Sequence, residues 1–201
     1  MPPLPARALD KGRRVTWTSA LLAACLAGCA SDAPNKAQLQ SWGYASWWLP
    51  PDIHDLRDSR FDRLAFFEIE LSTNGGIADA HGWPDAYSRL REAAARLRIP
   101  LDATLTLRGQ QNFESLFGSP EAVDRLLATC LALVEEDPYL QGLQLDFEQY
   151  DEASPRSLDA LRAFVPRLAS ALHGLSPARK LSVFVPTGGP KLYDADSLAE
   201  A

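Results

Sequence analysis

Residues 141–148, with the sequence QGLQLDFE, alternate between polar and apolar side chains, which is the period of a β-strand. The apolar side carries Leu143, Leu145 and Phe147, and the polar side Gln144, Asp146 and Glu148. Two acids and an amide on one face of such a strand are costly to bury unless they pair with one another or with a ligand. The α-carbons of Asp146 and Glu148 should lie roughly 6.5–7 Å apart, so their side chains can touch or share a proton. The strand therefore predicts a pair of carboxyl groups that handles protons.

An antiparallel strand with one solvated face alternates in the same way, so the flanking segments decide how the strand is placed. Before it, residues 119–136 predict a helix with Ser119 as its N-cap and Pro120 in the first helical position. After it, a second helical pattern begins at 154–155, and Pro166 is expected to kink or split that helix. Helix, strand and helix in succession predict a parallel sheet that is covered on its outer face. The polar face of the strand then lines a closed interior.

The strand resembles a signature of glycoside hydrolase family 18, the chitinase-like family, which is written D-G-x-D-x-D-x-E. Gly142, Asp146 and Glu148 match this pattern, whereas Gln141 and Gln144 stand where that family usually has aspartates. The resemblance extends from about residue 42 to the C-terminus. It departs from the family after the third strand, where the usual Ser-x-Gly-Gly is reduced to TLRG at 106–109.

This resemblance implies a (β/α)8 barrel of the TIM type. The expected strands cover residues 41–48, 64–71, 101–107, 142–148 and 181–186. Residues 41–201 number about 160, whereas a complete barrel needs about 250. We therefore expect an α/β chain truncated to about the first five βα units, with unpaired edges at its first and last strands.

The N-terminus has the features of a lipoprotein signal peptide over residues 1–28. A basic start precedes a short, mostly apolar stretch at 15–27, which is too short to span a bilayer because a spanning helix needs about 20 residues. The sequence LAGC then places Cys29 at the expected cleavage point, where it would carry the lipid; an ordinary signal peptide with an incidental cysteine is the alternative. Residues 29–40 are expected to be a tether. The predicted location is the cell envelope, at the outer membrane or facing the periplasm.

The charge of the chain excludes some partners. The net charge is −6, and removal of residues 1–28, which hold four basic and one acidic side chain, makes it more negative. Nucleic acid and anionic lipid are therefore not expected as partners, since both need basic patches.

No cofactor or metal is expected, because His54, His81 and His173 show no ligand spacing. Cys130 lies on an apolar helical stripe and is interpreted as a core residue.

The resemblance also implies a chemistry. In that family the acetamido group of the substrate attacks the anomeric carbon, so hydrolysis is substrate-assisted. Glu148 would be the general acid, and Asp146 would orient and stabilise the acetamido group. Gln144 would contact the substrate region and could donate a hydrogen bond to Asp146, but it cannot carry the charge of the aspartate usual at its position. We therefore expect Asp146 to ionise more readily than in the family, and the site to work more slowly or at a shifted pH.

Aromatic side chains at the first strand are the remaining candidates for binding. Tyr44, Trp47 and Trp48 could stack on sugar rings, and core packing is the alternative for each. Glu68 and Glu70 are expected either at the mouth of the site or on a solvated rim.

The leading hypothesis is a glycoside hydrolase that cleaves polysaccharide containing β-linked N-acetylglucosamine, such as chitin or peptidoglycan. The alternative is a non-catalytic carbohydrate-binding lipoprotein, or an inactive fragment, that keeps the barrel cleft.

Overall fold

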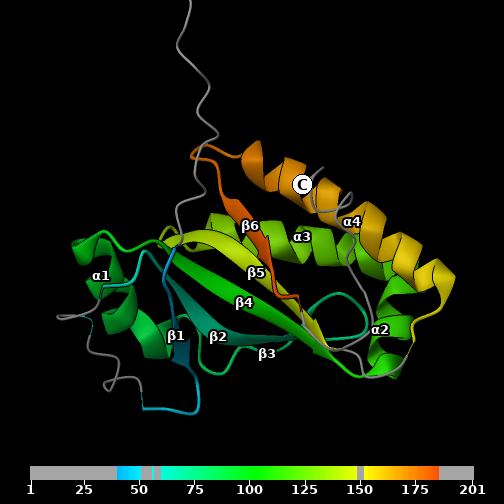
Figure 1. Ribbon diagram of the computed structural model, residues 1–201, viewed down its shortest axis with the longest axis horizontal. Coiled ribbons are helices and arrows are strands. Elements are labelled where there is room, and N and C mark those ends of the chain that lie inside the picture. The colour runs from blue at the N-terminus through cyan, green and yellow to red at the C-terminus, as the bar shows by residue number, and fades with distance from the viewer. Residues whose placement is uncertain (1–39, 51–55, 57–59, 149–151, 186–201) are drawn as a thin grey trace, which may run out of the picture. The chain divides into compact units, whose positions relative to one another are not determined.

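A sheet of mostly parallel strands forms the centre of the computed structural model, which describes residues 40–50, 56, 60–148 and 152–185. Within these residues the sheet has six strands in the order β1-β2-β4-β5-β6, with β3 beside β2 (Figure 1). The bounds are β1 Trp42–Ser46, β2 Arg63–Leu71, β3 Ile77–Asp79, β4 Leu101–Arg108, β5 Leu140–Glu148 and β6 Lys180–Val183. All neighbours pair in parallel except β3, which is antiparallel to β2. The predicted parallel sheet of βα units is confirmed.

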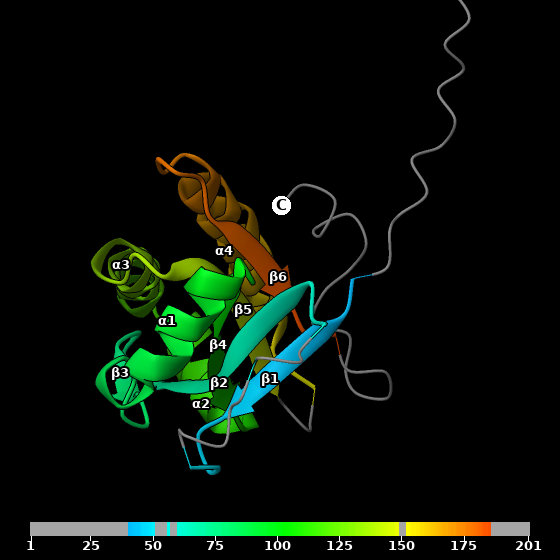
Figure 2. The ribbon, with the colours of Figure 1, turned by 90° about the vertical axis from the view of Figure 1, so that its left-hand side faces the viewer.

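The helices cover one face of this sheet, as the two ribbon views show (Figures 1 and 2). They are α1 Ser88–Leu97, α2 Gln110–Phe117, α3 Pro120–Glu136 and α4 Pro155–His173, with a short 3-10 helix at Asp85–Tyr87. The predicted start of α3 is confirmed, because the hydroxyl of Ser119 accepts a hydrogen bond of 3.2 Å from the backbone N–H of Ala122. None of the described helices is both long and apolar enough to cross a membrane.

Helix α4 decides one of two alternatives. Pro166 lies inside a helix that runs as 19 residues from Pro155 to His173, so of the expected kink or split, the split does not occur. A proline in a helix removes one backbone hydrogen bond. The neighbouring side chains Phe164, Val165 and Leu168 are fully buried, and their burial holds the helix together across this position.

The outer face of β5 is the apolar face that the alternation predicts. Leu143, Leu145 and Phe147 are almost completely buried. The ring of Phe147 packs edge-on against Phe117 of α2, with 5.7 Å between the ring centroids. Burial of each such side chain stabilises the fold by about 1.5–3 kcal/mol. This face fixes the strand against the helices and leaves Gln144, Asp146 and Glu148 on the other side.

A buried ion pair lies on the inner side of the sheet, near the N-terminal ends of its strands. Arg63 donates to the carboxylate of Asp102 at 2.5 and 2.7 Å. Burial raises the pKa of Asp102, and Arg63 and then Lys180 oppose this rise. A Cβ atom at Gly142 would lie 2.8 Å from Asp102 Oδ1 and 2.5 Å from the backbone oxygen of Lys180. Only glycine therefore fits at this position, which gives a packing reason for the Gly142 of the motif.

Strand ends differ from the sequence expectation in two places. β1 ends at Ser46, so Trp47 and Trp48 lie in the turn that follows it, not within the expected strand 41–48. β6 ends at Val183, short of the expected residue 186. The signal peptide, Cys29 and nearly all of the tether lie outside the described residues.

Candidate active site

The polar side chains of β5 lie beside polar side chains of the neighbouring strand β4. The paired residues of β4 and β5 are Thr104 and Gln144, Thr106 and Asp146, and Arg108 and Glu148. Because side chains alternate along both strands, these pairs share one face of the sheet, opposite the helices. The predicted grouping of Gln144, Asp146 and Glu148 on one side is confirmed.

Gln144 connects three strands. Its Oε1 accepts a hydrogen bond from the hydroxyl of Tyr44 on β1 and another from Thr104 on β4, both 3.1 Å long. The structure therefore brings together Gln144 and Tyr44, which are 100 residues apart in the sequence. Gln144 does not donate the hydrogen bond that it could give to Asp146 Oδ1, and that oxygen has no hydrogen-bond partner among the described residues.

Asp146 is the most perturbed carboxyl group of this face. The residue is only 7% exposed. Burial raises the pKa of Asp146 to about 6, with a further rise from the negative charge of Glu148, a lowering from Arg108 and a smaller rise from Glu68. A carboxyl group in this range exists in both protonation states near pH 6, so it can donate or accept a hydrogen bond.

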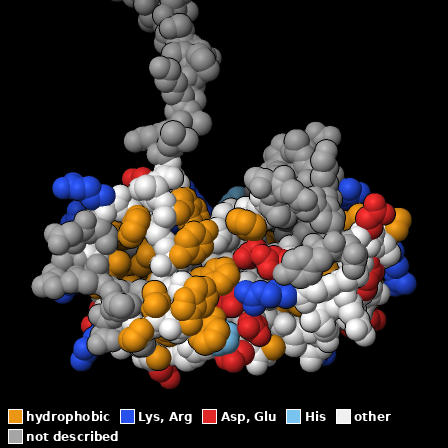
Figure 3. Space-filling view, turned by 60° about the horizontal axis from the view of Figure 1, so that its bottom comes forward, with side chains coloured by type: hydrophobic (Ala, Val, Ile, Leu, Met, Phe, Trp, Pro, Cys, Tyr) orange, Lys and Arg blue, Asp and Glu red, His pale blue; other side chains and the backbone are white. Residues whose placement is uncertain are grey.

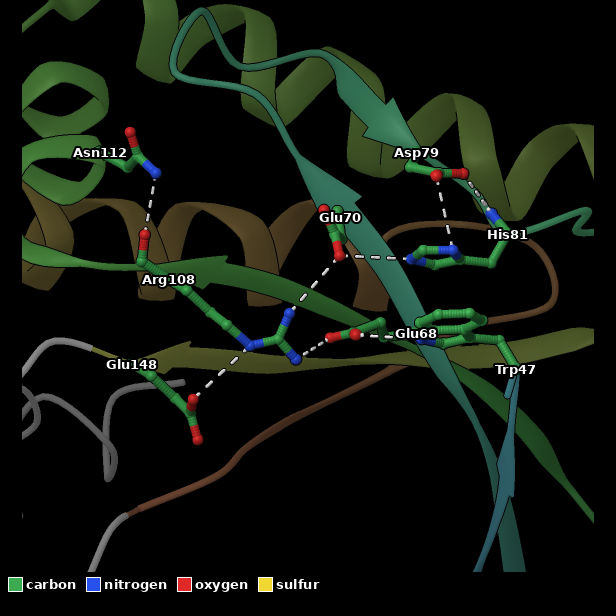
Figure 4. Close-up of polar contacts among 8 residues, drawn as sticks. All are labelled: Trp47, Glu68, Glu70, Asp79, His81, Arg108, Asn112 and Glu148. Carbon is green, nitrogen blue, oxygen red and sulfur yellow. Dashed lines mark hydrogen bonds and ion pairs between the residues drawn. The ribbon is translucent and has the colours of Figure 1, made fainter. Parts of the chain in front are cut away.

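Arg108 lies at the centre of a group of carboxylates at the C-terminal ends of the strands (Figure 4). Its Nη2 forms a short hydrogen bond to Glu68 Oε2, and its Nη1 lies 3.6 Å from Glu70 Oε1. Its Nε lies 3.7 Å from Glu148 Oε2. Glu68 is only 3% exposed, so the interpretation of this residue as a solvated rim is wrong. These contacts place the guanidinium group of Arg108 beside Glu148.

A second group of contacts joins the turn after β1 to the segment after β3. The ring of Trp47 stacks on His81 with 4.0 Å between centroids and 4° between planes. Trp47 Nε1 donates a hydrogen bond of 3.3 Å to Glu68 Oε1. His81 Nε2 lies 3.3 Å from Glu70 Oε1, so His81 is part of this group of contacts. The spacing of the histidines in the sequence did not indicate this position.

A cavity of about 330 Å³ opens beside Asp146. It is lined by Tyr44, Ser46, Trp48, Phe67, Gln144, Asp146 and Phe184. Trp48 is 57% exposed there, so a flat face is open to a ligand. Trp47 does not line the cavity, and its predicted sugar contact stays a prediction. Hydrophobic side chains gather beside acidic and basic ones on the face seen in Figure 3.

Comparison with known proteins gives a result at the level of the fold. No protein-family model matches the sequence, and no curated protein matches it. Solved structures do match. A class V chitinase from Pseudomonas fluorescens Pf-5 matches with a TM-score of 0.67 and 19% identity, over 81% of this chain and 52% of that chain. A family 18 chitinase from Cycas revoluta, solved with (GlcNAc)4, matches with a TM-score of 0.64 and 19% identity, over 80% and 52%.

A spore cortex-lytic enzyme, SleL of Bacillus megaterium, matches with a TM-score of 0.62 and 14% identity, over 82% of this chain and 41% of that chain. The fold of this chain is therefore similar to about half of the barrel in these solved structures. The chain spans about half the length of these structures. At these identities the matches define the fold, and the function has to be argued from the site.

Proposed function

We propose that this protein hydrolyses polysaccharide containing β-linked N-acetylglucosamine, with Glu148 as the general acid. The observation that carries the proposal is the placement of Asp146 and Glu148 on one face of β5, where Asp146 lines a cavity together with the aromatic side chains of Tyr44 and Trp48. A carboxyl group in an aromatic cavity, with a second carboxyl group two residues further along the same face, suits glycoside hydrolysis. The chitinase fold of the matching structures agrees with this assignment.

The proposed steps follow from the positions of the two acids. Glu148, which lies at the partly exposed end of β5, gives its proton to the glycosidic oxygen as the bond to the anomeric carbon breaks. The acetamido carbonyl of the same sugar forms the new bond to that carbon. Asp146 accepts the acetamido N–H and stabilises the positive charge that develops. Water then attacks the anomeric carbon, the bond from this carbon to the acetamido oxygen breaks, and a proton of the water returns to Glu148.

A Glu148→Gln variant tests this assignment. It keeps the size and polarity of the side chain but has no proton to give, so we expect product release from chitooligosaccharides to fall at least about 100-fold. Oligosaccharide affinity should remain within a few fold. Glu135→Gln is the matched control, because Glu135 is exposed near the C-terminal end of α3, before β5 begins. Hydrolysis that survives in Glu148→Gln refutes the role of Glu148.

Binding without catalysis is the second candidate function. Gln144 replaces the acid expected behind Asp146, and Arg108 occupies the space next to Glu148, which favours a site that has kept the cleft and lost the reaction. Calorimetric titration with chitooligosaccharides, run beside the hydrolysis assay, separates the two. Saturable binding with no released product supports the binding protein.

We also propose that the protein is held at a membrane through a lipid on Cys29. The proposal rests on the basic start, the short apolar stretch and the LAGC sequence. Acyl chains on this residue would anchor the chain by burying methylene groups in the bilayer. The tether at 29–40 would then present the catalytic domain to polysaccharide of the cell envelope.

A further inference from the structure

Three metal-ligating side chains meet at the C-terminal end of β2, outside the cavity described above. Glu68, Glu70 and His81 each bring one ligand atom to a common point, and these atoms all lie within 4.8 Å of one another. Glu68 and Glu70 come from β2, and His81 follows β3 (Figure 4). The antiparallel pairing of β2 with β3 therefore creates a set of ligands that is dispersed in the sequence.

The two ring nitrogens of His81 both face carboxylates. Nδ1 lies 3.5 Å from Asp79 Oδ2, and Nε2 lies 3.3 Å from Glu70 Oε1. A neutral imidazole has one N–H and can donate to one of these carboxylates only, whereas an imidazolium can donate to both. In the neutral form with Nδ1 donating to Asp79, the lone pair of Nε2 points at the negative oxygen of Glu70. A cation between Nε2 and Glu70 turns this repulsion into two bonds.

The separation of these two atoms fits a shared metal ion. Bonds of about 2.0–2.1 Å in tetrahedral geometry place neighbouring ligand atoms about 3.3–3.4 Å apart. The 3.3 Å between Nε2 and Glu70 Oε1 meets this value, and the ligand atom of Glu68 lies within 4.8 Å of the other two. The ring is also held in plane, because Trp47 stacks on it at 4.0 Å.

The charge around the site is strongly negative. Glu68, Glu70, Asp79 and Glu148 all belong to one network of contacts. In the described part of the chain, Arg108 is the only arginine or lysine in ion-pair contact with these carboxylates. Its contact with Glu70 is 3.6 Å, longer than the roughly 2.7–2.9 Å of a charge-assisted hydrogen bond. One monovalent cation therefore leaves an excess of negative charge that a divalent ion would offset.

We propose that Glu68, Glu70 and His81 bind one divalent transition-metal ion of the Zn²⁺ type. Imidazole with carboxylates suits this class, whereas Mg²⁺ and Ca²⁺ prefer sets of oxygen ligands alone. Asp79 orients His81 through Nδ1, as carboxylates behind metal-bound histidines do. Arg108, which is partly exposed, gives up its contact with Glu68 when the ion binds. This inference stands whether or not the protein cleaves polysaccharide.

Equilibrium dialysis of the purified full chain against Zn²⁺ tests the proposal. We expect one ion per chain, and a large excess of Mg²⁺ should not displace it. His81→Gln and Glu70→Gln should each lower the affinity at least about 10-fold, and Asp79→Asn should lower it about 10-fold. Asp159→Asn is the control, since it removes an exposed carboxylate on α4 and should leave Zn²⁺ binding unchanged.

Nitrogen NMR of the histidine rings gives a second measurement on the wild-type chain, so a variant that fails to fold does not block the test. Zn²⁺ should shift the Nε2 signal of one histidine and leave its Nδ1 protonated. The absence of saturable binding overturns the proposal. So does binding that His81→Gln leaves intact, because it would mean that exposed carboxylates alone collect the ion.

Discussion

Replacement of Asp146 by asparagine should stabilise the fold above pH 6. The carboxyl is buried and its Oδ1 has no hydrogen-bond partner among the described residues. Burial, with help from the charge of Glu148, raises the pKa of Asp146 from 3.8 to about 6. At 1.36 kcal/mol for each pKa unit, the ionised form in the folded state is disfavoured by up to about 3 kcal/mol.

The sign of the pH dependence follows from this direction. Between about pH 4 and pH 6 the folded state holds a proton on Asp146 that the unfolded state has released, so stability falls as pH rises. Above pH 6 the full penalty is present in the wild type and absent in Asp146→Asn. The variant should therefore be more stable by about 2–3 kcal/mol at pH 8, and this difference should disappear below about pH 4.

Urea unfolding followed by circular dichroism at pH 4, 6 and 8 measures this difference. The midpoint should move while the slope with urea stays the same, since the exposed surface is unchanged. Asp159→Asn is the matched control, because Asp159 is exposed and its pair with Arg162 is a surface contact, worth less than about 1 kcal/mol. Equal stability of wild type and Asp146→Asn at pH 8, or a difference that grows towards pH 4, refutes the reasoning.

Three further predictions follow from other positions. Gly142→Ala should lower the free energy of unfolding by about 1–3 kcal/mol, because the added Cβ atom would press on Asp102 and on the β6 backbone. Urea unfolding measures this loss, with Gly76→Ala as the control. Arg108→Met should lower the free energy of unfolding by about 3 kcal/mol at pH 7, because Glu68 is left buried without its cation. Arg108→Lys should restore part of the loss, and unchanged melting of Arg108→Met contradicts this prediction. Cys29→Ser should abolish incorporation of a labelled fatty acid in cells, whereas a Cys25→Ser control keeps the label.

Local signals in the sequence predicted the elements that depend on one segment alone. Ser119 followed by Pro120 marks the start of α3, and the period of two in residues 141–148 separates the core face of β5 from the site face. The interpretation of Cys130 as a core residue is confirmed, since it is fully buried and burial raises the pKa of its thiol to about 12. Each of these features follows from capping or burial within a single element.

Contacts between elements could not be predicted in the same way. Arg108 meets Glu68 only because the register between β2 and β4 shifts between Phe67 and Ile69, which adds one residue to β2 at that point. His81 reaches Glu70 through the β2–β3 pairing and a backbone with a positive φ of 49°. Neither a register shift nor a left-handed turn at a histidine leaves a periodic signal in the sequence. The missed residues are those whose positions depend on how two strands align.

The contact between Arg108 and Glu148 bears directly on the choice between hydrolysis and binding alone. At 3.7 Å it is too long for a hydrogen bond, whereas the contact of Arg108 with Glu68 is short. A sugar oxygen can therefore engage Glu148 without breaking the stronger pair. Asp146 likewise does not depend on an acid at position 144 to hold a proton, because burial is the largest cause of its raised pKa. Neither Gln144 nor the position of Arg108 beside Glu148 thus blocks the proposed roles of the two acids, and for this reason we rank hydrolysis ahead of binding alone.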